Sequence, residues 1–160
     1  MNEFFELIED ILFHDEFLKL KDMTHHKGSR YDHLVSVSYH SYKIAKKYNL
    51  DYKSVARGAL LHDFFLYDWR EYKKNNRFNI KNNHGLNHPK VALNNAIKYF
   101  DLNDKEKDII VKHMWPKCIG IPKYKESYLV SFVDKHIATI EFLEEFGMKN
   151  KFELVLEDVI

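Results

Sequence analysis

A histidine and an aspartate stand side by side in an otherwise apolar run, Ala59-Leu60-Leu61-His62-Asp63-Phe64-Phe65. Neighbouring side chains on a helix point about 100° apart, so these two polar groups cannot both face water while the rest of the run is buried. An ionised aspartate in apolar surroundings is costly unless it is paired or bound to a metal ion. Two interpretations follow. Either His62 and Asp63 are metal ligands, since imidazole and carboxylate commonly bind Zn, Fe and Mn, or Asp63 caps the next segment and His62 is a hydrogen-bonded core histidine.

The composition is that of one globular domain. The chain has 160 residues, enough for a single core, with 45% hydrophobic and 31% charged residues, and we expect one domain over residues 1–160. Lys and Arg number 25 against 24 Asp and Glu, which gives no electrostatic reason to expect a nucleic acid or an anionic membrane as partner. The apolar stretches are far shorter than the roughly 20 residues of a membrane span. An acidic N-terminus and the single cysteine, Cys118, predict a cytoplasmic protein without an internal disulfide.

Apolar residues recur at helical spacing along most of the chain, and no segment shows the alternation of a strand. Helices are expected over about 2–22 with a break near 14–15, and over about 29–49, 52–65, 88–100, 105–114 and 126–146. Ser29 or Asp32 and Asn103 or Asp104 are expected caps, and Pro89 suits the first position of its helix. Residues 66–87 are expected to form a long loop, a feature that is often functional. The predicted fold class is all-α, a compact single-domain helical bundle.

Further polar residues with metal-binding chemistry lie on these helices. His33, His88 and His113 each lie near the end of an expected helix, and Asp134 interrupts the apolar run Val130-Ser131-Phe132-Val133 much as Asp63 interrupts its own. Taken singly, each has an ordinary explanation, such as a hydrogen-bonded histidine in the core. Their order along the chain is more informative than any one of them.

The order His, His-Asp, His, His, Asp on successive helices resembles the HD-domain superfamily of metal-dependent phosphohydrolases. The local matches are Arg30-Tyr31-Asp32-His33 with the first-ligand helix, Ala59-Leu60-Leu61-His62-Asp63 with the signature helix, His88-Pro89-Lys90-Val91-Ala92 with the second-metal helix, Val111-Lys112-His113 with the next ligand, and Val133-Asp134-Lys135 with the closing aspartate. The resemblance spans about residues 26–140.

Two segments depart from the family pattern. Many relatives follow the His-Asp pair with Ile-Gly-Lys or a similar turn that carries Lys or Glu, whereas this chain has Phe64-Phe65-Leu66-Tyr67-Asp68, which leaves Asp68 as a possible replacement. Met114-Trp115-Pro116 stands where the cyclic-di-GMP-hydrolysing subgroup has its extended Gly-Tyr-Pro region, so that substrate is not assigned.

The resemblance implies a centre of two divalent transition-metal ions, drawn from Fe, Mn, Zn, Co or Mg. One ion would take His33, His62, Asp63 and Asp134, and a second would share Asp63 and add His88 and His113. Two ions about 3.5–4 Å apart can hold a bridging hydroxide and clamp a phosphoryl oxygen.

Residues beside these ligands are candidates for the reaction itself. The candidate catalytic residues are Asp63, His84 and Asp68, and the candidate substrate-binding residues are Arg30, His26, Lys135 and Trp115. The two cations could bind phosphate or form ordinary ion pairs. His84 could be a ligand, a proton donor to the leaving group or a solvated loop residue, and Trp115 could stack on a base or pack against the fold.

The expected function is that of a phosphatase or phosphodiesterase acting on a nucleotide or another small phosphate ester. Two other functions are compatible with the same ligands. One is a di-iron HD-type oxygenase, and the other is a non-catalytic module that binds a nucleotide. Oxygen consumption would identify the first, and a thermal shift without product would identify the second. The sequence does not predict an oligomeric state.

Overall fold

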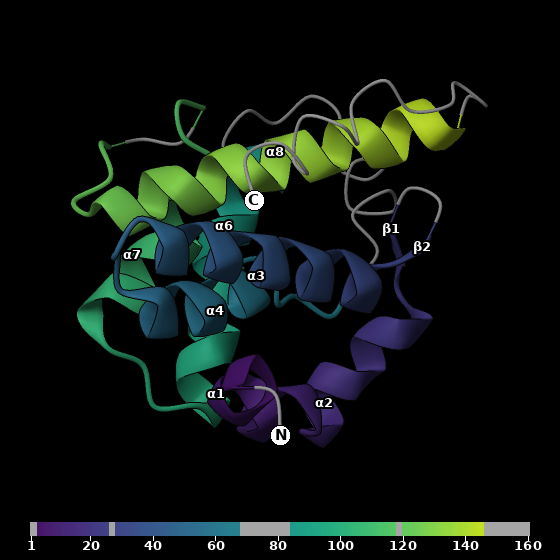
Figure 1. Ribbon diagram of the computed structural model, residues 1–160. Helices are drawn as coiled ribbons and strands as arrows, with labels where there is room; N and C mark the ends of the chain where they lie inside the picture. The colour runs from purple at the N-terminus through teal and green to yellow at the C-terminus, as the bar shows by residue number, and fades with distance from the viewer. Residues whose placement is uncertain (1–2, 26–27, 68–83, 118–119, 146–160) are drawn as a thin grey trace.

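The computed structural model describes residues 3–25, 28–67, 84–117 and 120–145, and within these it is a helical bundle (Figure 1). Its elements are α1 (Glu3–Leu12), α2 (Asp15–Leu18), the 3₁₀ helix η1 (Lys19–Asp22), β1 (Thr24–His25), β2 (Gly28–Ser29), α3 (Arg30–Lys47), α4 (Tyr52–Leu61), α6 (His84–Tyr99), α7 (Asp104–Lys112) and α8 (Lys125–Glu145). The strands β1 and β2 form only a short antiparallel ladder. The predicted all-α class is confirmed. Within the described residues, no helix combines the length and apolar character needed to span a membrane.

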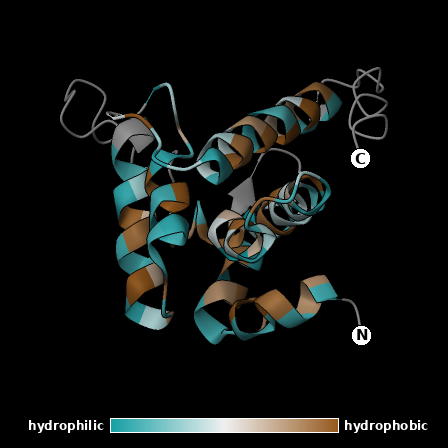
Figure 2. Cartoon of the chain, turned by 60° about the vertical axis from the view of Figure 1, so that its left-hand side comes forward, coloured by the Kyte–Doolittle hydropathy of each residue, from teal (hydrophilic) through white to brown (hydrophobic). Residues whose placement is uncertain are grey.

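Two helices, α3 and α4, lie at the centre of the bundle. Figure 1 shows α8 running along the top of α3, α4 directly beneath α3, and α1 and α2 at the bottom. Hydrophobic and hydrophilic residues share the long helices, as expected for helices that bury one face (Figure 2). Helix α4 contributes to two buried clusters, Leu60 and Leu61 to one and Val55 and Ala59 to the other. The residues that follow α4 therefore enter the interior between two apolar cores.

Local capping sets where α3 and α7 begin. The Ser29 hydroxyl accepts from the Asp32 N–H at 3.1 Å, and the Asp32 carboxylate in turn accepts from the Ser29 N–H. Asn103 and Glu106 form the same reciprocal pair at the start of α7. Such capping boxes satisfy N–H groups that have no partner inside the helix. The predicted caps are confirmed at Ser29 and Asn103, and α3 thus places His33 in its first turns.

Two predicted helix boundaries were wrong. Helix α4 ends at Leu61 and not near Phe65, because the carbonyls that follow find donors elsewhere: Asn95 donates to Phe64 at 3.0 Å and Arg30 donates to Phe65 at 2.5 Å. Helix α6 begins at residue 84, one turn before the expected start, so Pro89 lies inside it. A proline there forfeits one backbone hydrogen bond of the helix. The rest of the expected long loop, residues 68–83, lies outside the described residues.

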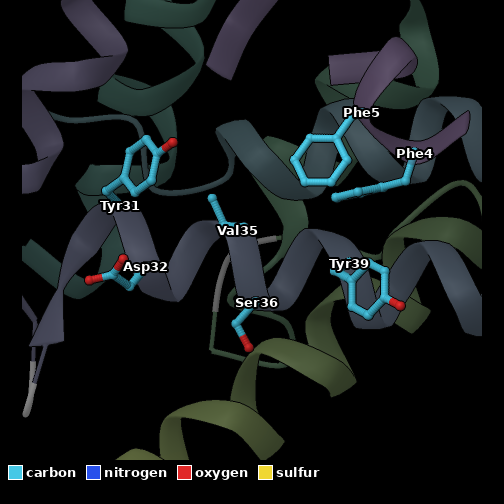
Figure 3. A pocket seen from close by; sticks show the side chains of 7 residues that line it. All are labelled: Phe4, Phe5, Tyr31, Asp32, Val35, Ser36 and Tyr39. Atoms are coloured by element: carbon cyan, nitrogen blue, oxygen red, sulfur yellow. The ribbon is translucent and has the colours of Figure 1, made fainter. Parts of the chain in front are cut away.

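A pocket opens between α1 and α3 (Figure 3). Its volume is about 450 Å³, and it is lined by Phe4, Phe5, Tyr31, Asp32, Val35, Ser36 and Tyr39. None of the six predicted metal ligands lines it. The pocket is therefore separate from the predicted metal centre.

A glycine allows α4 and α7 to approach closely. A Cβ atom at Gly58 would lie 3.0–3.1 Å from three side-chain atoms of Ile109, which is fully buried. We expect Gly58→Val to lower the free energy of unfolding by about 1–3 kcal/mol, because overpacking forces strained rotamers or backbone shifts. Chemical denaturation measures the loss, and adding Ile109→Ala should recover part of it. A Gly58→Val protein as stable as the parent would show that α4 and α7 separate freely.

Glu3 ties α1 to α3 and α4. Its carboxylate accepts from the hydroxyls of Tyr42 at 2.8 Å and Tyr52 at 3.1 Å, and it also pairs with Lys46. The Lys46 and Tyr42 hydrogen bonds lower the pKa of Glu3 to about 2 from an ordinary value of 4.5. A carboxyl with a lowered pKa stabilises the fold above its unfolded pKa, and this contribution is lost as the pH falls through the folded pKa.

The stability of a Glu3→Gln variant should therefore depend on pH less than that of the parent. We expect Glu3→Gln to melt below the parent at about pH 6, and the difference to shrink between about pH 4.5 and pH 2. Thermal melts at several pH values test this, with Glu6→Gln on the same helix as control. A difference that does not change with pH would contradict the role of the Glu3 charge.

Candidate metal centre

The first group of possible ligands brings together α3, the end of α4 and α8. It consists of His33, His62 and Asp134, whose ligand atoms all lie within 4.8 Å of one another. The Asp134 Oδ1 atom is 3.2 Å from Nε2 of His33 and 3.4 Å from Nε2 of His62. All three residues are buried. Residues 101 positions apart in the sequence thus meet at one point.

The second group shares His62 with the first. The ligand atoms of His62, Asp63 and His113 are again within 4.8 Å of one another. Asp63 Oδ1 is 3.2 Å from Nε2 of His88 and 3.3 Å from Nε2 of His113. The two imidazole Nε2 atoms of His88 and His113 are 2.9 Å apart. The structure therefore gathers all six predicted ligands, and His62 belongs to both groups.

Helix ends orient two of these rings. His62 and His113 are the C-cap residues of α4 and α7, and their Nδ1 atoms lie 2.7 Å and 2.8 Å from the carbonyls of Ala59 and Ile110. The last carbonyls of a helix have no partner inside it, so they are open to such donors. Because a carbonyl only accepts, Nδ1 carries the proton in both rings. Each Nε2 then presents a lone pair to the site.

The electrostatics of the site keep its carboxylates ionised. Burial by itself would raise the pKa of Asp134, but the neighbouring His62 and His33 lower it well below its usual range. Burial opposes ionisation of Asp63 too, yet His88 and His113 hold its pKa well below 3.8. Burial lowers the pKa of His113. The donor set is thus anionic oxygen and imidazole nitrogen.

The residues fit a bound metal ion. In the described part of the chain, His62 Nε2 and Asp63 Oδ1 are buried without a hydrogen-bond partner. The Nε2 atom of His113 carries a lone pair only 2.9 Å from Nε2 of His88, an arrangement that needs a proton or a cation between or beside them. Buried polar atoms without partners are costly. A divalent cation among these nitrogens and oxygens would satisfy them.

A model of one protein family matches most of the chain. The family is described as the HD domain, and the match covers residues 30–139. The chain belongs to the HD-domain family. HD domains bind divalent metal ions, and most of them are metal-dependent hydrolases. Searches against curated proteins and against solved structures gave no significant match.

Arg30 of this HD domain lies inside the protein and contacts the backbone. Its side chain is 1% exposed, and it donates to the carbonyls of Phe65 at 2.5 Å and Tyr67 at 3.5 Å. The guanidinium also stacks 3.8 Å from the centre of the Phe65 ring. These contacts hold the segment that follows the His62-Asp63 pair. The predicted role of Arg30 in phosphate binding stays a prediction.

Lys135 and Trp115 connect α7 to α8 beside the predicted ligand His113. Lys135 Nζ donates to the carbonyl of His113 at 2.9 Å and to the hydroxyl of Ser131 at 2.7 Å. The Ser131 hydroxyl donates to the carbonyl of Trp115 at 3.0 Å. Trp115 is 37% exposed, and its indole packs edge-on against Tyr128. Lys135 thus supports the backbone of the predicted ligand His113, while Trp115 presents an aromatic surface near it.

The remaining predicted site residues fall where the structure gives no side chain. His26 and Asp68 lie outside the described residues. His84 begins α6, but its side chain is not among those described. Their roles stay predictions.

Glu141 contacts the predicted ligand His33, and it was not identified from the sequence. Both of its carboxylate oxygens lie 3.0 Å from Nδ1 of His33. Burial by itself would lower the pKa of His33, but hydrogen bonds to Asp134 and Glu141 outweigh it and raise that pKa to about 10. Glu141 follows Asp134 by seven residues, two turns along the same face of α8, and this spacing is the signal that could have identified it.

Proposed function

We propose that this HD domain is a metal-dependent phosphohydrolase that acts on small phosphate esters. The single observation that carries the proposal is the meeting of six predicted ligands from five parts of the chain, in two adjoining groups that share His62. Membership of a family made up mostly of metal-dependent hydrolases supports the same function.

The two groups would hold two divalent ions. His33, His62 and Asp134 would hold one. Asp63 and His113 of the second group, together with His88, would hold the other, and His62 would lie within reach of both ions. When bound, such a pair supplies an activated water and neutralises the charge of a phosphoryl group. The protein side chains supply ionised carboxylates and imidazoles already turned toward the centre. Burial of the ligands restricts water to the positions that the ligands leave open.

A nucleotide is the substrate class that we favour. Trp115 presents a partly exposed indole two residues after the ligand His113, and its carbonyl is anchored to α8. An aromatic face beside a phosphate site can stack on a base, a contact worth about 1–3 kcal/mol. A simple phosphate monoester would not use this surface.

Metal analysis and a substrate panel test the proposal. The metal content of the purified protein is measured first, and turnover is then followed for phosphomonoesters, phosphodiesters and nucleotides with Mn, Fe, Co and Mg. We expect metal-dependent release of phosphate or cleavage of a diester, faster for nucleotides than for esters without a base. Oxygen consumption during turnover would identify an oxygenase instead. A thermal shift with nucleotides but no product would identify a binding module.

A further inference from the structure

We propose that Glu141 is a positioning residue that holds His33 with its Nε2 toward Asp134 and makes the His33, His62 and Asp134 group the tighter of the two metal sites. The inference rests on the proposed metal centre. Glu141 reaches the ring from α8 and His33 stands on α3, two helices that lie along each other (Figure 1).

The geometry fixes which ring nitrogen of His33 faces the metal site. Nδ1 lies 3.0 Å from both oxygens of Glu141, and Nε2 lies 3.2 Å from Asp134. A carboxylate accepts hydrogen bonds, so the proton of a neutral ring belongs on Nδ1. His33 is 2% exposed, which leaves the ring little room to turn. Nε2 therefore stays directed at the His62 and Asp134 ligand atoms, and it would offer a lone pair to a metal ion that takes the place of its proton.

The group that accepts a hydrogen bond from Nδ1 of His33 differs in charge from the groups that accept from Nδ1 of His62 and His113. His62 and His113 donate to neutral backbone carbonyls, whereas His33 faces an anionic carboxylate. A carboxylate behind a ligating imidazole makes the ring a stronger base and so a stronger ligand, and losing such a partner typically weakens metal binding about 10–100-fold. This difference favours binding of the first ion in the group that contains His33.

Charge balance points the same way. Among the described residues at the centre, Asp63 and Asp134 are the carboxylates that face ligand nitrogens directly, and Glu141 adds a third behind His33. Two divalent ions bring four positive charges into surroundings of low dielectric, where unbalanced charge is costly. Removing the Glu141 charge should therefore weaken binding even where the hydrogen bond is kept.

Three variants separate these effects. Glu141→Gln keeps an acceptor oxygen but removes the charge, Glu141→Leu removes both, and Glu144→Gln removes a charge from the same helix as the matched control. The readout is Zn²⁺ affinity by competition with a chromophoric chelator, together with the nitrogen chemical shifts of His33. We expect the affinity of the tighter Zn²⁺ site to fall about 10–100-fold in Glu141→Gln and further in Glu141→Leu. The affinity of the second site should not change in these variants, and Glu144→Gln should bind Zn²⁺ as the parent does.

The His33 ring reports on positioning independently of turnover. In the Zn²⁺-bound protein, the His33 ring should be protonated at Nδ1 alone in the parent and in Glu141→Gln, and this form should be lost or mixed in Glu141→Leu. Equal Zn²⁺ affinities for the parent and Glu141→Gln would overturn this inference and leave the proposed function standing. Absence of metal binding by the parent protein would overturn both. A fall in melting temperature with unchanged Zn²⁺ affinity would assign Glu141 a structural role only, and that also overturns the inference.

Discussion

Replacing Asp63 with asparagine is expected to abolish hydrolysis and to lower the metal content of the protein at the same time. Asp63 Oδ1 lies 3.2 Å and 3.3 Å from the Nε2 atoms of His88 and His113, and its Oδ1 is buried without a hydrogen-bond partner in the described residues. An amide has nearly the same shape but carries no charge, so it cannot balance a divalent ion. We expect turnover to fall by about a thousandfold, which is the upper end of the effect of losing one preorganised electrostatic contact. Elemental analysis and initial rates measure the two losses together.

A buried aspartate outside the centre gives the matched control. Asp108 accepts from the Ser127 hydroxyl at 2.6 Å and from the Lys123 N–H at 3.0 Å, and it contacts none of the predicted ligands in these hydrogen bonds. Asp108→Asn should lower the melting temperature while the metal content of the folded protein stays that of the parent. If Asp63→Asn kept both its metal and its turnover, the proposed function would be wrong.

Local sequence signals predicted where several helices begin. Ser29 and Asn103 each cap the helix that follows, because a cap depends on side chains only a few residues away. The expected break near His14 is also present: α1 ends at Leu12, and the His14 ring accepts from the Glu16 N–H at the start of α2. Contacts at short range can be predicted from the sequence because both partners appear in the same window.

The end of α4 depends on partners far away in the sequence. Arg30 and Asn95 supply donors to the carbonyls of Phe65 and Phe64 from 35 and 31 residues away. No local pattern carries that information, so apolar periodicity extended the predicted helix too far. The early stop matters for the site, because it makes His62 a C-cap residue and opens the Ala59 carbonyl to its ring.

The candidate metal centre likewise has features that could be predicted from the sequence and one that could not. The order of His and Asp residues along the helices predicted which ligands would meet, and the structure gathers them in two groups. Glu141 was not predicted, since one carboxylate on an amphipathic helix is usually solvated and its partner His33 is 108 residues away. A role that arises from a contact between distant helices becomes visible only with the fold.

Replacing Arg30 with methionine is expected to destabilise the protein and to weaken metal binding through the segment after the His-Asp pair. The change leaves the Phe65 carbonyl without its donor and removes the stacked guanidinium. Together these losses should lower the free energy of unfolding by about 3 kcal/mol. For a chain of this size, that loss corresponds to a melting temperature lower by about 6–12 °C. Differential scanning calorimetry of the metal-free protein measures it without reference to activity.

An arginine on another helix separates stability from site geometry. Arg57 is partly buried, donates to Asp10 at 2.6 Å and to the Leu7 carbonyl at 3.1 Å, and pairs with Glu106 at 3.2 Å. It therefore links α4 to α1 and to the start of α7, and none of these contacts is made with a predicted ligand. Arg57→Met should lower the melting temperature with Zn²⁺ affinity unchanged, whereas Arg30→Met should lower both when measured well below the melting temperature. The melting temperature and Zn²⁺ affinity of Arg30→Lys should lie between those of the parent and of Arg30→Met. An ammonium group can donate hydrogen bonds, but it cannot reproduce the planar pair of donors or the stacking of a guanidinium. Equal Zn²⁺ affinities for Arg30→Met and the parent would mean that the Phe65–Tyr67 backbone holds its place without the guanidinium, and that His62 and Asp63 are positioned by α4 alone.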